Sequence, residues 1–181
     1  MTGLYHYVPH DKVILTNQYS SELSKLVNNC FLAQRVSSIN SISILCEEYE
    51  ADVKEIKTCI AADSRIGSKF LNSSVGFGGS CFKKDMLALI YLAEMKGLQE
   101  VADYWNAVIK MNEYRKKKFF ERIFSTLNYN IKNKQICILG TAFKKDTNDP
   151  RESPAVEICR YLLDEGAKLR LHDPETKLEN V

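Results

Sequence analysis

Cys81 is the residue in this sequence best placed to act as a nucleophile. It ends a glycine-rich loop that begins at Asn72, and it precedes a predicted helix over residues 83–96. A thiol at a helix N-terminus faces the positive end of the helix dipole, and Lys83 and Lys84 add positive charge beside it. Both effects favour the thiolate, which is the nucleophilic form of cysteine. The alternative interpretation is a buried structural cysteine beside an acidic helix cap.

Three further polar residues are spaced so that they could assist such a sulfur atom. Asp85 follows Cys81 by four residues and shares its helix face if the helix begins by Cys81. A carboxylate there could hold the water that hydrolyses a covalent intermediate. Lys25 and Asn29 are also four apart, so an amine and an amide would lie side by side and could stabilise an oxyanion. The simpler alternative for Lys25 and Asn29 is a solvated helix surface.

A basic loop follows the strand predicted at residues 135–139. It begins at Gly140 and lacks the Gly-x-Gly-x-x-Gly fingerprint of dinucleotide sites. Lys144, Lys145 and Arg151 surround it at the carboxyl end of a strand, where open α/β sheets bind ligands. The charges suit a diphosphate or a sugar nucleotide. A basic surface loop without a ligand remains an alternative.

Four helices are predicted ahead of this loop, over residues 20–49, 52–62, 83–96 and 98–127. Ser20 or Ser21 caps the first, Asp52 and Glu55 form a capping box for the second, and Gly97 ends the third. Apolar residues recur at helical spacing through the fourth, which would be about 45 Å long. A helix of that length is expected to bridge two domains or to form an oligomer interface.

The remaining elements predict one β-α-β unit. Residues 135–139 form an unbroken apolar strand typical of a buried parallel sheet, and residues 168–172 form the second strand. Ser153 caps the intervening helix, Pro154 takes its first position, and Gly166 ends it. Residues 12–16 also read as a strand, but an isolated one. Because one β-α-β unit makes no stable sheet, we expect the domain to continue beyond the sequence at hand.

The composition is that of an ordinary globular protein, and it excludes several other classes. The chain is 45% hydrophobic and 27% charged, with a net charge of +2, which argues against a nucleic-acid partner. The basic run from Arg115 to Lys118 reads as a solvated helix face. Six cysteines form no Cys-x-x-Cys pair and have no histidine at ligand spacing, so no metal site is predicted. Free thiols in apolar runs indicate a reducing, cytoplasmic location, and no apolar stretch is long enough for a membrane span.

The motifs occur in an order that resembles the UDP-glucose branch of the nucleotide-sugar 6-dehydrogenase family. They are Glu22–Leu26 with Asn29, Ser37–Ile42, Gly76–Asp85 and Gly140–Ser153. The resemblance implies a mainly α helical domain with a long connecting helix, followed by the start of a doubly wound α/β (Rossmann-like) domain. Residues 1–18 would be the tail of an NAD-binding domain, 19–128 the central helical domain, and 129–181 the start of the UDP-sugar-binding domain.

The resemblance also implies a reaction. The family uses NAD to oxidise C6 of UDP-glucose twice, giving UDP-glucuronate. Cys81 would capture the aldehyde as a thiohemiacetal, which a second oxidation turns into a thioester that water hydrolyses. Lys25 and Asn29 would stabilise the negative oxygen, and Asp85 would position water. Two oxidations at one carbon require such a tether, because a free aldehyde could escape.

The binding residues implied by the resemblance form two sets. Substrate contacts are implied for Arg65, Phe70, Leu71, Phe77, Gly78, Phe143 and Lys144, of which Arg65 would reach the substrate of a neighbouring subunit. NAD contacts are implied for Lys84 and Arg151. Two positions depart from the family pattern. Lys83 replaces a proline or glutamine, and Asn72 stands where some members have lysine, so one charge contact with the substrate is expected to be missing.

Three other functions compete with this prediction. A sister enzyme would act on GDP-mannose or a UDP-N-acetylhexosamine with the same cysteine chemistry. A helical dimerisation module, forming a homodimer or higher oligomer, would need no chemistry at all. A thiol-dependent hydrolase is disfavoured because His6, His10 and His172 bear no visible relation to Cys81. The 181-residue chain alone is expected to be inactive, and detectable reduction of NAD⁺ with UDP-glucose would contradict that.

Overall fold

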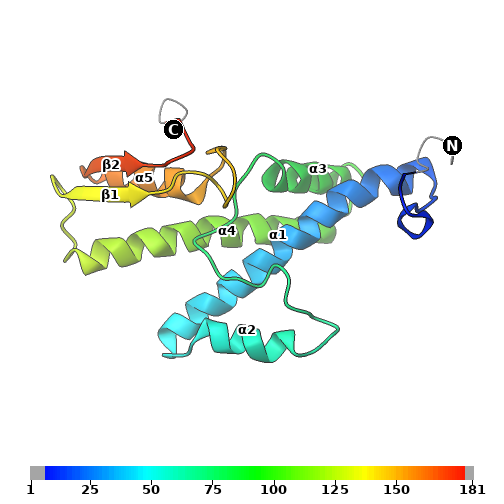
Figure 1. Ribbon diagram of the computed structural model, residues 1–181, viewed down its shortest axis with the longest axis horizontal. Helices are drawn as coiled ribbons and strands as arrows, with labels where there is room; N and C mark the ends of the chain where they lie inside the picture. The colour runs from blue at the N-terminus through cyan, green and yellow to red at the C-terminus, as the bar shows by residue number, and fades with distance from the viewer. Residues whose placement is uncertain (1–6, 178–181) are drawn as a thin grey trace.

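The computed structural model describes residues 7–177 and shows a helical part joined to a small β-α-β unit (Figure 1). Residues 1–6, which include His6, and residues 178–181 lie outside the described residues. The elements are a 3-10 helix η2 (His10–Lys12), α1 (Gln18–Glu48), α2 (Val53–Ala61), α3 (Phe82–Glu94), α4 (Gln99–Thr126), β1 (Gln135–Leu139), α5 (Pro154–Asp164) and β2 (Lys168–His172). The mainly helical prediction with a short α/β portion is therefore confirmed.

The caps of the first two helices come from short polar side chains. Asn17 caps α1, because its side-chain oxygen accepts a hydrogen bond from the amide of Ser20 at 2.8 Å. The prediction of a serine cap was therefore wrong, and α1 begins at Gln18. Asp52 caps α2 as predicted and accepts from the amide of Lys54 at 2.7 Å. Each cap satisfies an amide that the helix leaves without a partner.

The helical part is held together by one apolar cluster between α1, α3 and α4. Cys30 and Ala33 of α1 are fully buried, and these small side chains let α1 lie close to Met86 of α3. Trp105 and Val108 contribute the α4 side of the cluster. The cluster fixes the relative positions of α1 and α3, which carry most of the residues with predicted chemistry.

The loop between α2 and α3 is pinned by polar side chains from two helices. Asn112 of α4 accepts from the amide of Phe77 at 2.8 Å and donates to its carbonyl at 3.1 Å. Asn40 of α1 accepts from the amide of Ser74 at 2.7 Å. Asn112 and Asn40 are both buried, so these bonds replace backbone pairing that a loop would otherwise lack.

The long predicted helix is confirmed as α4, which runs from the helical part to beneath the β-α-β unit (Figure 1). Its last turns contribute Phe120 and Ile123 to a second apolar cluster with Ile158 and Leu162 of α5. Apolar packing at both ends of α4 therefore joins the helical part to the β-α-β unit.

The predicted solvated basic face of α4 is wrong for its first two residues. Arg115 and Lys116 are buried, with 8% and 3% of their surface exposed. Arg115 forms an ion pair with Glu47 at 2.8 Å and donates to the carbonyl of Ser74, and Lys116 pairs with Glu113 at 2.9 Å. Their aliphatic stems pack while their charged ends find partners, which is the condition for burying a cation.

The two strands pair in parallel, with Gln135 opposite Lys168 and Leu139 opposite His172. The prediction of a buried strand without alternation is wrong, because inward and exposed residues alternate along both strands. Leu139 is 78% exposed, since α5 covers only one face of the sheet in the described part of the chain. The strand predicted at residues 12–16 is also wrong. More than four-fifths of the surface of Ile14 and of Leu15 is exposed, and neither pairs with a strand in the part of the chain that the structure describes.

No helix in the described residues is both long enough and apolar enough to cross a membrane.

Candidate active site

Asp85 is the centre of a polar cluster between α1 and α3. Its Oδ2 atom accepts hydrogen bonds from Nζ of Lys25 and Nδ2 of Asn29, both at 2.6 Å. The i, i+4 spacing of Lys25 and Asn29 puts both on the side of α1 that faces α3. Three of the four residues with a predicted catalytic role are therefore in direct contact, although Asp85 is 60 residues from Lys25 and 56 from Asn29 in sequence.

The cluster holds its charges firmly at neutral pH. Burial opposes the charged form of Asp85, but the hydrogen bonds from Lys25 and Asn29 outweigh it and set the pKa of Asp85 below its ordinary value. The hydrogen bond with Asp85 raises the pKa of Lys25, and the nearby Cys81 adds to the rise. Asp85 is thus a carboxylate and Lys25 an ammonium. Lys25 suits the stabilisation of a negative oxygen rather than the removal of a proton.

Cys81 lies at the start of the same helix, one turn before Asp85. Its carbonyl accepts the amide of Asp85 at 2.9 Å, and it occupies the N-cap position of α3. The cysteine is exposed, and its sulfur lies 3.9 Å from the hydroxyl of Ser80. Lys25 from α1 and Arg151 from the loop before α5 both lie within electrostatic reach of this sulfur, so two cations are near it.

The other five cysteines differ from Cys81 in their surroundings. Cys30, Cys46 and Cys159 are buried, and burial raises the pKa of the Cys30 thiol to about 11. Cys59 and Cys137 are exposed, but Cys59 is on α2 and Cys137 is in the middle of β1. All six are free thiols, and no cluster of residues in the described part of the chain could hold a metal ion.

A cavity of about 530 Å³ lies beside Cys81. A volume of this size suits a small organic ligand. Its lining is mostly apolar, contains no carboxylate, and has Lys144 as its one charged residue. The lining residues are Leu32, Val36, Phe70, Asn72, Ser74, Gly76, Phe77, Gly78, Gly79, Ser80, Cys81, Phe82, Phe143 and Lys144. Five of the seven predicted substrate contacts are therefore here, with the predicted nucleophile in the same wall.

The remaining two predicted substrate contacts lie elsewhere. Leu71 is buried, with 5% of its surface exposed, and it does not line the cavity. Arg65 has an 87% exposed side chain and forms an ion pair with Asp63 at 2.6 Å. An arginine so exposed is free to turn toward another molecule, but within this chain it does not reach the cavity.

A second hollow lies on the other side of Gly79 and Ser80 and contains both predicted NAD contacts, Lys84 and Arg151. Arg151 already forms a double hydrogen bond with Asp149, which lowers the pKa of Asp149 to about 2. Lys84 has no ion pair with any residue of the described chain. Its free ammonium fits an anionic cofactor group such as a pyrophosphate.

Lys83, which departs from the family pattern, has a structural explanation in this hollow. Its ammonium forms an ion pair with Glu152 at 3.0 Å, so it ties the start of α3 to the β-α-β unit. The hydrogen bond with Glu152 raises the pKa of Lys83, so Lys83 stays an ammonium at neutral pH. Lysine at position 83, in place of the family's proline or glutamine, is therefore compatible with a helix α3 that begins at Phe82.

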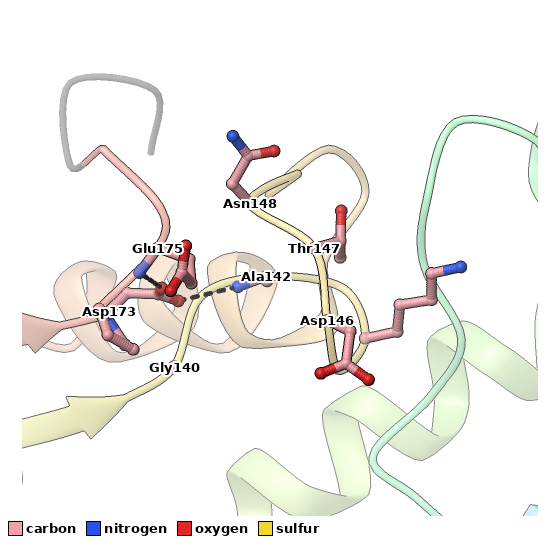
Figure 2. A pocket seen from close by; sticks show the side chains of 9 residues that line it. Gly140, Ala142, Asp146, Thr147, Asn148, Asp173 and Glu175 are labelled. Carbon is pink, nitrogen blue, oxygen red and sulfur yellow. Dashed lines mark hydrogen bonds between the residues drawn. The ribbon is translucent and has the colours of Figure 1, made fainter.

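A third hollow lies at the carboxyl ends of β1 and β2, where the sequence predicts a ligand site (Figure 2). Asp173 lies in it, but its carboxylate accepts from the amides of Thr141, Ala142, Glu175 and Thr176, which together hold its pKa far below the ordinary value. Asp173 therefore closes the ends of the two strands rather than binding a ligand. Lys144 lines both this hollow and the cavity beside Cys81.

Some residues that help to form the site were not predicted from sequence, and Asn112 and Leu32 are two of them. Asn112 positions the Phe77 backbone, and Leu32 of α1 lines the cavity. Asn112 follows Val108 by four residues, so it interrupts an apolar stripe of the predicted helix. This interruption indicates a buried polar contact at Asn112. Leu32 had no signal, because an apolar helix residue looks the same whether it lines a cavity or fills a core.

Comparison with known proteins gives two matches to family models. Residues 19–114 match the central domain of the UDP-glucose/GDP-mannose dehydrogenase family, and residues 137–181 match the UDP binding domain of the same family.

Individual relatives agree with these matches. The chain is 56% identical over 176 residues to UDP-glucose 6-dehydrogenase from Bos taurus and 52% identical over 176 residues to UDP-glucose 6-dehydrogenase 2 from Arabidopsis thaliana. It covers 36% and 37% of those proteins, with 97% of its own length aligned. The structure of a UDP-glucose dehydrogenase from Pyrobaculum islandicum superposes with a TM-score of 0.89 at 34% identity, over 96% of this chain and 39% of that one. The chain thus spans a little over a third of the length of these relatives.

Proposed function

Because this chain belongs to the UDP-glucose/GDP-mannose dehydrogenase family, we propose that it supplies the cysteine site of an NAD-dependent UDP-glucose 6-dehydrogenase. The observation that supports this most is the contact of Lys25 and Asn29 with Asp85, one turn from an exposed Cys81 in a cavity wall. The names of the relatives favour UDP-glucose over GDP-mannose or a UDP-N-acetylhexosamine as the substrate.

The sulfur of Cys81 forms the covalent bond in the proposed reaction. The thiolate attacks the C6 aldehyde, an S–C bond forms, and the carbonyl electron pair moves onto oxygen. The Lys25 ammonium stabilises that oxyanion, and the oxygen then takes up a proton to give the thiohemiacetal. Lys84 and Arg151 would hold NAD⁺, which would supply the hydride acceptor for both oxidations. The thiohemiacetal loses a hydride and a proton to become a thioester.

Asp85 serves the last step, in which water attacks the thioester carbon and the Cys81 thiolate leaves. The Oδ2 atom of Asp85 is occupied by Lys25 and Asn29, and no hydrogen bond to Oδ1 is made by any residue of the described chain. Oδ1 can therefore accept a hydrogen bond from the attacking water and orient it. Since its pKa is lowered, Asp85 stays ionised and orients the water, and the proton that the water loses passes to solvent.

The proposal extends to partners and location. Large apolar side chains are exposed on three helices of the helical part, including Phe31 on α1, Tyr91 on α3 and Tyr104 on α4. They support self-association through this part of the chain, as a homodimer or a higher oligomer. Six free thiols fit a cytoplasmic, reducing environment. The sequence holds no dinucleotide fingerprint, which supports the expectation that the 181-residue chain alone is inactive.

The proposed function is tested by the alkylation of Cys81 in the purified chain. We expect iodoacetamide to modify Cys81 at least about tenfold faster than Cys59, because only Cys81 combines exposure with a helix N-terminus and nearby cations. UDP-glucose should slow the reaction at Cys81 and leave that at Cys59 unchanged. Rates are measured by peptide mass spectrometry.

Cys59 is the matched internal control, since it is also exposed but is on α2. Free glucose is the control for the nucleotide part of the ligand. Equal alkylation rates at Cys81 and Cys59, with no protection by UDP-glucose, would contradict the proposed function.

A further inference from the structure

A lysine outside the predicted site reaches the wall of the cavity beside Cys81. Lys57 of α2 donates from Nζ to the side-chain oxygen of Asn72 at 2.5 Å. Asn72 is one of the residues that line the cavity. Lys57 is half-buried and Asn72 is exposed, so this hydrogen bond holds the ammonium at the solvent-facing rim of the cavity wall.

Lys57 has no acidic partner to neutralise it. No ion pair joins it to a carboxylate in the described part of the chain. The positions three and four residues away on α2 are occupied by Val53, Lys54, Ile60 and Ala61. None of these is acidic, so the neighbours on the same helix face cannot supply a counter-charge. By contrast, Lys83 and Lys116 are each paired with a glutamate.

The positive charge of Lys57 would complement an anionic ligand in the cavity. The lining contains no aspartate or glutamate, and Lys144 is its one charged residue. The diphosphate of a nucleotide sugar carries roughly two negative charges, and charge-assisted hydrogen bonds to phosphate are among the strongest polar contacts. Lys144 alone would neutralise only one of these two negative charges. The ammonium of Lys57, held at the wall by the neutral amide of Asn72, could neutralise the other.

We propose that Lys57 contacts the diphosphate of the nucleotide sugar and sets the specificity of the cavity for a diphosphate over an uncharged nucleoside. Lys57 thereby supplies, from a neighbouring helix, the charge contact that Asn72 was expected to remove. This inference rests on the proposed function of the cavity. The competing interpretation is that the bond from Lys57 to Asn72 only anchors α2 to the loop.

The test compares binding of UDP and uridine to the purified chain by isothermal titration calorimetry. Lys57→Gln is expected to weaken UDP binding about 5- to 10-fold, the size of one lost charge-assisted hydrogen bond, and to change uridine binding less than about twofold. Lys54→Gln is the matched control, because Lys54 is an exposed lysine on the same helix and has no contact with Asn72. It should leave both affinities unchanged.

A second variant returns the charge by another route. In Lys57→Gln/Asn72→Lys the amine extends from the cavity wall itself, and we expect UDP affinity to return to within about threefold of the unmodified chain. Urea unfolding of Lys57→Gln should be unchanged.

The other outcomes overturn the inference in separable ways. Unchanged UDP affinity in Lys57→Gln, or equal losses for UDP and uridine with reduced stability, would show that Lys57 is only an anchor. Failure of the unmodified chain to bind UDP at all would instead overturn the proposed function of the cavity.

Discussion

Cys81→Ser is expected to lower the rate of UDP-glucuronate formation by at least ~1000-fold and to leave UDP-glucose binding within about threefold of its original value. A serine hydroxyl at this position is not ionised, so it is a far weaker nucleophile toward the aldehyde. Oxygen is only slightly smaller than sulfur, so the exchange enlarges a cavity of about 530 Å³ with fourteen lining residues very little, and binding should persist. An interaction made only during the reaction affects kcat without affecting binding.

The measurement uses the chain grafted into a full-length relative in place of the matching segment. NADH formation reports the rate, and calorimetry reports the affinity for UDP-glucose. Cys59→Ser is the matched control, since it makes the same exchange at an exposed cysteine on α2 and should leave both quantities unchanged. A Cys81→Ser enzyme with more than a tenth of the original rate would rule out the covalent step.

Gly78→Ala is expected to reduce the free energy of unfolding by about 2–4 kcal/mol. A Cβ atom at Gly78 would lie 2.3 Å from the carbonyl oxygen of Glu152 and 3.0 Å from Cδ of Pro154. Neither neighbour can yield easily, because one is backbone and the other is a proline ring in the first turn of α5. The next residue donates its amide to the carbonyl of Arg151 at 3.0 Å, so the same shift would break that hydrogen bond.

Gly78→Ala should also weaken the binding of UDP-glucose, because the loop that contains Gly78 also carries Cys81. We expect UDP-glucose to protect Cys81 of the variant from alkylation poorly, even below the unfolding transition. Urea unfolding is followed by fluorescence of the single tryptophan, Trp105, which is buried in the helical cluster.

Gly97→Ala is the control for the glycine-to-alanine exchange itself. Gly97 has a φ of +68° and no atom within 4 Å of an added Cβ, so its cost is backbone strain alone, about 1–2 kcal/mol. Gly78 does not adopt that left-handed region, so its cost is steric. Equal stability of the two variants, with full protection of Cys81 in each, would show that the contact with Glu152 is easily relieved.

These contacts place the site at a junction rather than within one part of the chain. The loop between α2 and α3 carries Cys81, α1 carries Lys25 and Asn29, and the segment before α5 contributes Phe143 and Lys144 to the cavity. A Cβ on Gly79 would lie 2.7 Å from the ring of Phe143, so glycine is required for the loop and ring to pack. Movement of the β-α-β unit against α4 would therefore change the shape of the cavity.

The extents of the longer helices, and the helix positions of the residues proposed to bear chemistry, were predictable from the sequence. Lys25 and Asn29 share a helix face, Asp85 follows Cys81 by one turn, and α4 runs almost as its apolar spacing predicts. Helix faces and caps depend on residues within a turn of one another, so local spacing carries that information. The strand at residues 12–16 failed because strand formation needs a partner, which local sequence does not supply.

Tertiary structure alone decided which of these residues meet and which are buried. Asp85 joins Lys25 and Asn29 because Cys30, Ala33 and Met86 pack α1 against α3, and no spacing rule relates positions about 60 residues apart. Packing between segments distant in sequence also decided three other features. These are the burial of Arg115, the exposed face of β1 and the hydrogen bond from Lys57 to Asn72. Burial and long-range partners depend on the packing of distant segments, whereas a linear pattern records only the preferences of each segment.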